Sequence, residues 1–156
     1  MQTIAHAEDK LLHFFFLAAS DFVIGPDADY AVRNVIGVAR ANPDLAQKVV
    51  TMRYKAQMIL EKFAGKSIHP IAGVTGGFSK AMTEKERQWI LADMQEILDF
   101  ALHTIEFAKT WVFPRYLDTI KSLGVIRTGF LGTVAADGAM ALYDGQLRLM
   151  HPGCSR

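Results

Sequence analysis

Cysteine is almost missing from this sequence of 156 residues, in which Cys154 stands alone. A disulfide needs two cysteines and a thiolate metal site needs up to four, so one cysteine excludes both within this chain. Long apolar runs are missing too. The most apolar stretch, LLHFFFLAASDFVIG, contains His13 and Asp21 and is shorter than the roughly 20 residues that a membrane-spanning helix takes. We therefore expect no membrane span, and the lack of a cationic leader before an apolar core predicts no signal peptide.

A strong charge of either sign is also absent, because 17 basic residues balance 16 acidic ones. This balance argues against binding to nucleic acid or to an anionic membrane. The hydrophobic fraction of 51% and the charged fraction of 21% are typical of a folded globular chain rather than a disordered one. No internal repeat or linker divides the sequence, so its length predicts one domain.

Helical spacing of apolar residues dominates the pattern and predicts a mainly α fold. A first helix over about residues 1–20 is apolar all round between residues 11 and 19, which is typical of a helix inside a larger body. The segment SDFVIGPDADY, which starts at Ser20, predicts a loop. A second helix is predicted from Asn42, a capping residue, to Gly65. Its apolar stripe consists of Leu45, Val49, Met52, Ala56, Ile59 and Phe63.

The longest helix is predicted from Thr83 to about Pro114, because Thr83 and Glu86 form a capping box and apolar residues follow at spacings of three and four. Pro114 should kink or restart this helix, which then runs to Gly124. The following segment, TGFLGTVAADGAMALYDGQLRLM, has short apolar runs separated by the turn sequences ADG and YDG. It predicts a small C-terminal β-meander.

One polar face of the first helix is a candidate site. His6, Asp9, Lys10 and His13 lie at spacings of three and four and therefore share this face. Two imidazoles and a carboxylate could bind a metal or move protons, although Lys10 would repel a cation. A solvated stripe is the alternative interpretation. His103 lies on the polar stripe of the longest helix and is interpreted as a surface histidine.

A glycine-rich loop, KSIHPIAGVTGGFSKAM, is the second candidate. His69 precedes a proline, which predicts extended backbone at that position. Gly76 and Gly77 permit unusual backbone angles, and with Lys80 they could present amides and a cation to an anion or a partner surface. A tight packed turn is the alternative. The spacing is not that of a phosphate-binding loop.

Four strings together resemble a known family. They are LLHFFFLAASDFVIGPDADYAVRNVIG, ANPDLAQKVV, GKSIHPIAGVTGGFSKAMTEKER and TGFLGTVAADGAMALYDGQLRL. In this order they resemble an internal segment of a nickel–iron hydrogenase large subunit of the soluble, cytoplasmic type. The resemblance implies a long-helix, large-subunit-like fold, with residues 1–156 as a single partial domain and a cytoplasmic location.

The resemblance also implies an activity and its requirements. The family oxidises H2 reversibly to protons and electrons at a nickel–iron centre, NiFe(CN)2CO, and passes the electrons to an iron–sulfur small subunit. Four cysteines in two CxxC motifs hold the metals, and this sequence contains neither motif. We therefore expect no cofactor in this chain and no activity of the chain by itself, whether it is a fragment, the product of a truncated gene or a protein that has lost the activity.

Particular residues match the family pattern. Asp9 and His13 correspond to an outer shell of the metal site, although Lys10 replaces a histidine of the pattern. His69 corresponds to a histidine on the side where the small subunit binds and electrons leave. The resemblance assigns to this same side Gly76, Gly77 and Lys80.

A second interpretation is a non-catalytic helical interaction module, or a degenerate paralogue, that binds an iron–sulfur small subunit. The fragment interpretation predicts that the isolated chain exposes an apolar patch beside residues Phe14–Phe16 or along Leu147–Met150, whereas a self-contained module would cover it. Such a patch should make the chain self-associate.

Overall fold

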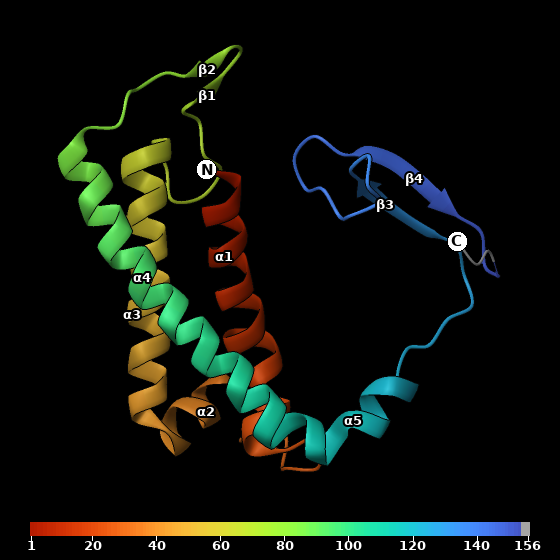
Figure 1. Ribbon diagram of the computed structural model, residues 1–156. Helices are drawn as coiled ribbons and strands as arrows, with labels where there is room; N and C mark the ends of the chain where they lie inside the picture. Colours follow the sequence, from red (N-terminus) through yellow and green to blue (C-terminus); the bar gives the residue numbers. More distant parts are fainter. Residues whose placement is uncertain (154–156) are drawn as a thin grey trace. The chain divides into compact units, whose positions relative to one another are not determined.

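Helices make up most of the chain in the computed structural model, which describes residues 1–153 (Figure 1). The chain forms two compact units, residues 1–114 and the residues from 115 onward. The helices of the first unit are α1 (Gln2–Leu12), η1 (His13–Ala18), η2 (Ser20–Ile24), α2 (Val35–Ala41), α3 (Pro43–Ala64), α4 (Glu84–Phe107) and η3 (Ala108–Val112). A short hairpin of β1 (Gly73–Val74) and β2 (Gly77–Phe78) joins α3 to α4. The predicted mainly α fold is confirmed.

Capping residues set the ends of α3 as predicted. The side chain of Asn42 accepts a hydrogen bond from the backbone N–H of Leu45, and Pro43 occupies the first helical position, where its missing N–H is not needed. Gly65 ends the helix with a φ of 83°, a left-handed conformation that costs glycine little.

The first helix is longer and wider than predicted. It continues as the π-helical turns η1 and η2 to Ile24, so the loop predicted from Ser20 begins only at Gly25, whose φ is 118°. The helix α2 was not predicted. Its N-terminus is capped by Asn34, whose side chain accepts hydrogen bonds from two backbone N–H groups. The short VIGVARA segment has no apolar period long enough to be recognised in the sequence.

The core of the first unit lies where α1, η1, α3 and α4 meet. The prediction of an apolar stripe on α3 is confirmed. The expected exposed patch at Phe14–Phe16 is wrong, because Phe15 is buried and its ring stacks on that of Phe100 at a centroid distance of 5.2 Å. The buried cluster is Leu11, Phe15, Ala19, Val49, Met52, Ala56, Ile59, Ile97 and Phe100.

The predicted capping box of the longest helix is confirmed at Thr83 and Glu86. The prediction that Pro114 restarts the helix is confirmed. The hydrogen bonding widens to η3, and α5 (Phe113–Ser122) then begins, which places Pro114 in a first turn, where a missing N–H is tolerated. No helix among residues 1–153 is long and apolar enough to cross a membrane.

The second unit contains most of α5 and one antiparallel pair, β3 (Phe130–Val134) with β4 (Gln146–Met150). The predicted β-meander is therefore reduced to two strands plus a single bridge between Val134 and Met140. Two bent segments explain this: a turn at residues 136–138, where the side chain of Asp137 accepts a hydrogen bond from the N–H of Ala139, and a bend at residues 142–144 leave few residues for a middle strand. Leu147 is 77% exposed, so the apolar surface expected at Leu147–Met150 is present.

Candidate functional site

The polar face of α1 lies on the surface. Asp9 and His13 are both exposed, and the Asp9 carboxylate pairs with the Lys10 ammonium at 3.1 Å. Lys10 lowers the pKa of Asp9, and the charges of His6 and His13 lower it slightly further. Lys10 thus already neutralises Asp9, and the geometry fits a solvated stripe better than a metal site. The predicted roles of Asp9 and His13 near a metal remain predictions.

A neighbouring acid, Glu8, points the other way and was not predicted. Its carboxylate accepts hydrogen bonds from Arg53 at 2.9 Å and from Gln57 at 3.2 Å, both on α3. The Arg53 guanidinium also lies 5.3 Å from the ring centroid of Phe16. This arrangement ties α1, η1 and α3 together. The sequence signal that could have indicated it is an arginine next to the apolar stripe of α3.

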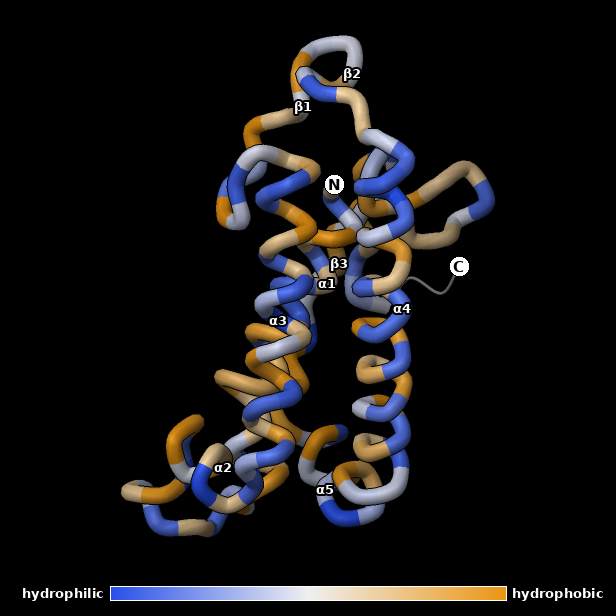
Figure 2. The backbone as a smooth tube through the Cα atoms, turned by 90° about the vertical axis from the view of Figure 1, so that its left-hand side faces the viewer, coloured by the Kyte–Doolittle hydropathy of each residue, from blue (hydrophilic) through white to orange (hydrophobic). Residues whose placement is uncertain are grey.

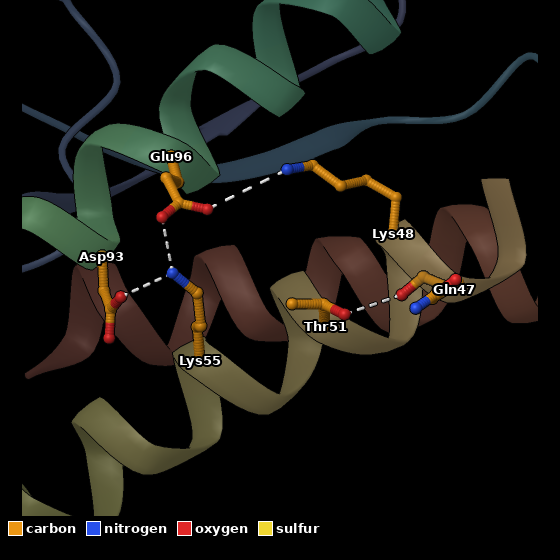
Figure 3. Close-up of polar contacts among 6 residues, drawn as sticks. All are labelled: Gln47, Lys48, Thr51, Lys55, Asp93 and Glu96. Carbon is orange, nitrogen blue, oxygen red and sulfur yellow. Dashed lines mark hydrogen bonds and ion pairs between the residues drawn. The ribbon is translucent and has the colours of Figure 1, made fainter. Parts of the chain in front are cut away.

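A second polar cluster joins α3 to α4 (Figure 3). The ammonium of Lys55 donates hydrogen bonds of 2.7 Å to both Asp93 and Glu96, and Lys48 lies 3.9 Å from Glu96. Asp93 and then Glu96 raise the pKa of Lys55. Every charge in the cluster has an opposite partner, so we interpret it as a clamp between two helices rather than a catalytic group.

The glycine-rich loop has an unexpected backbone at His69. The prediction of extended backbone there is wrong, because the φ of His69 is 55°. Only short-range sterics entered that prediction, whereas two hydrogen bonds from the N–H groups of Ile71 and Ala72 to the Ala64 carbonyl fold the loop back onto the end of α3. His69 is exposed. Strained residues of this kind are frequent at functional sites.

The strain at His69 gives a testable prediction. A left-handed conformation costs an L residue about 1–2 kcal/mol and costs glycine little. We expect His69→Gly to be more stable than His69→Ala by about 1 kcal/mol, since both variants lack the imidazole. Urea unfolding of the two variants measures the difference. Equal stability would show that His69 is not strained.

The prediction that Gly76 and Gly77 adopt unusual backbone angles is confirmed. Gly76 and Gly77 have φ values of 89° and 154°; Gly76 lies in the turn between β1 and β2, and Gly77 is the first residue of β2. The ring of Phe78 stacks on that of Phe63 at 4.9 Å. Lys80 pairs with Glu86 at 2.7 Å, so its charge is partly used inside the loop. The loop presents an exposed surface with His69 and the glycine turn.

Glu86 gives a prediction of pH dependence. Lys80, and then the backbone and side chain of Thr83, lower the pKa of Glu86 from 4.5 to about 2. A lowered pKa stabilises the folded state above pH 4.5, and this stabilisation is lost as the pH falls toward 2. We expect Glu86→Gln to flatten the decline of unfolding free energy between pH 4.5 and pH 2. Urea unfolding across this range measures it, and parallel curves for both proteins would refute the prediction.

An open cavity of about 380 Å³ lies between η1, the start of α3 and the end of α4. Phe14, Phe15 and Phe107 form its apolar wall, while His103 and Glu106 stand among the polar residues of its lining. His103 is exposed, as predicted. Glu106 already pairs with Lys109 at 2.8 Å. Within residues 1–153, no group of three or more His, Cys, Asp or Glu side chains is placed to hold a metal ion.

No family model matches the chain, but it is similar to several hydrogenase subunits. It is 45% identical over 141 residues to the vhu F420-non-reducing hydrogenase subunit of Methanocaldococcus jannaschii, a match that covers 90% of this chain and 33% of that relative. The F420-non-reducing hydrogenase iron-sulfur subunit of Archaeoglobus profundus is 33% identical over 144 residues, covering 90% and 30%. The beta subunit of the NAD-reducing hydrogenase HoxS of Cupriavidus necator is 27% identical over 143 residues, covering 88% and 29%.

A solved structure shows the same fold. One chain of an NAD+-reducing NiFe-hydrogenase, crystallised in the H2-reduced state, superposes on this chain with a TM-score of 0.83 at 33% sequence identity. The match covers 97% of this chain and 34% of that chain. This chain therefore spans about a third of the length of the relatives it matches.

The comparisons correct the prediction of a nickel–iron large-subunit segment. One relative is named a beta subunit of a hydrogenase, and another is named an iron–sulfur subunit. This chain is thus similar to a hydrogenase subunit. The predicted assignment to the large subunit is wrong, and the large-subunit-like fold and the role in H2 oxidation that were predicted with it are not supported. The motifs that carried the resemblance determine helices and turns, so they do not identify the subunit. Metal ligands would distinguish one subunit from another, but paired cysteines are missing from the sequence.

The cofactor prediction is corrected with it. We predicted a nickel–iron centre for the family and no cofactor in this chain. The name of the A. profundus relative implies an iron–sulfur group instead. Iron–sulfur clusters are usually held by four cysteine thiolates. This sequence has only Cys154, which lies outside the described residues. The residues of this chain do not fit such a group, so any cluster would have to be held by residues outside it.

Proposed function

We propose that this chain is a non-catalytic helical module of a hydrogenase subunit. In this proposal it forms part of a multi-subunit hydrogenase and packs against a partner that carries iron–sulfur clusters. The chain supplies a rigid set of helices, and electron transfer and metal chemistry belong to residues outside it. A cytoplasmic location is part of the proposal and rests only on the resemblance of the sequence motifs to those of the soluble, cytoplasmic type.

The similarity to a chain of a solved hydrogenase, with a TM-score of 0.83 over 97% of this chain, is the observation that carries the proposal. The side chains agree with it. The charged groups inside the first unit, such as Lys55 with Asp93 and Arg53 with Glu8, are paired across helices and stabilise packing. A catalytic role would instead favour unpaired titratable groups in a cleft.

The glycine-rich loop is the surface that we propose for the iron–sulfur partner. His69, Gly76 and Gly77 are exposed there, and Lys80 lies at the end of the loop. The left-handed backbone of His69 supports a functional role, since such strain persists where a surface must keep a particular shape.

A chimera tests the proposal. The 141 matched residues of the M. jannaschii relative are replaced by this chain, and the chimera is produced with the other subunits of that hydrogenase. We expect it to co-purify with them in the same ratio as the native protein. A second chimera with His69→Ala should lose part of this assembly, whereas His103→Ala, another exposed histidine, should not. A folded chimera that stays alone would contradict the proposal.

The isolated chain should bind no nickel stoichiometrically and show no H2-dependent dye reduction. The reason is that a site with four thiolates cannot form from Cys154 alone. Elemental analysis of the purified chain measures the metal content. One tightly bound nickel per chain would contradict this prediction.

A further inference from the structure

The helix α4 has a second apolar face that nothing in the first unit covers. Leu91, Leu98 and Ile105 recur every seven residues, and Leu102 lies beside them. Their exposed fractions are 59%, 50%, 49% and 53%. We name these four side chains the α4 stripe.

The spacing places the stripe beside the core face rather than within it. Ile97 and Phe100 on the core face are buried against α3 and η1, whereas the stripe lies further round the helix. Figure 2 shows apolar positions recurring along α4 between hydrophilic ones. A helix with so wide an apolar sector belongs between two layers, and only one of these layers is present in the first unit. A seven-residue repeat is typical of a seam between two helices.

Charge bounds the stripe at both ends and is missing between them. Arg87 pairs with Glu84 at 2.7 Å before the stripe, and Lys109 pairs with Glu106 at 2.8 Å after it. From residue 91 to residue 105 the helix rises about 21 Å, and the stripe itself contains no charged residue; Asp99, which accepts a hydrogen bond from Gln95, lies at its border. We therefore expect the matching surface to be apolar along its centre and about four turns long.

We propose that the α4 stripe is the docking surface for a helix from the part of a hydrogenase subunit that lies outside the matched third. This inference rests on the proposed function. In the solved hydrogenase the same fold is part of a chain of which it makes up 34%, so about two thirds of such a chain is available to cover the stripe. The M. jannaschii relative has the same proportion, with 33% of its length matched.

Fragment complementation tests the docking surface. This chain is produced together with the unmatched remainder of the M. jannaschii relative as separate polypeptides, and their affinity is measured by titration calorimetry. The variant Leu98→Glu/Leu102→Glu places two charges in the stripe. The control Ala92→Glu/His103→Glu places two charges on the polar face of the same helix, where both residues are exposed. Circular dichroism checks that both variants keep their helices.

We expect the unmodified chain and the control to bind the remainder equally and the stripe variant to bind at least about 100-fold more weakly. Equal binding by the stripe variant would overturn the inference, and so would a lack of binding by the unmodified chain. A chain that dimerises until the stripe is charged would identify a second copy as the occupant and would also overturn it. The chimera that tests the proposed function keeps every segment in one polypeptide. Its assembly with the other subunits therefore does not depend on whether the separate fragments bind each other, and the two proposals can fail independently.

Discussion

Replacing Ile59 with alanine should lower the free energy of unfolding of the first unit by about 2–5 kcal/mol. Ile59 lies on α3 at the centre of the core with no exposed surface. The substitution removes buried methyl and methylene groups and leaves a cavity, because α1 and α4 are both fixed against α3 and cannot close the gap. Urea unfolding followed by circular dichroism measures the change.

Val50 on the same helix provides the control, since it is 58% exposed. Val50→Ala should change the free energy of unfolding by less than about 0.5 kcal/mol. If the two variants are equally stable, α3 does not lie in the core as described.

Replacing Phe15 with alanine should cost about 3–5 kcal/mol. Phe15 is 9% exposed, and it contacts Phe14 edge-on at 4.9 Å and stacks on Phe100 at 5.2 Å. The loss should exceed that expected from area alone, because aromatic pairs contribute beyond burial. Tyr54→Ala is the matched control, as Tyr54 is 61% exposed. A small effect at Phe15 would mean that η1 does not pack against α4.

Local signals in the sequence predict much of the fold. The capping residue Asn42, the left-handed Gly65 and the capping box at Thr83 lie where the structure has them, since each depends on neighbours within a few residues. The apolar period of α3 also identifies its buried face. The π-helical turns could not be predicted, because widened hydrogen bonding around residues 13–24 and before Pro114 has no compositional signature.

The candidate site could be predicted only in part. Asp9 and His13 share a face as expected, but the inward-facing acid is Glu8, and its partner Arg53 lies 45 residues away. Contacts over such distances depend on how helices pack, which periodicity does not determine. The same limit explains His69, whose backbone is set by hydrogen bonds to the end of α3. Loop motifs identified similarity to hydrogenases and could not distinguish the subunit.

The hydrogenase activity of the chimeric complex is the measurement that tests the central claim most directly. The claim is that this chain supplies structure to a hydrogenase subunit while the chemistry lies elsewhere. The complex containing the M. jannaschii chimera should reduce dye with H2, and the isolated chain should not. A chimeric complex that assembles with full metal content and stays inactive, or an isolated chain that is active, would contradict the account.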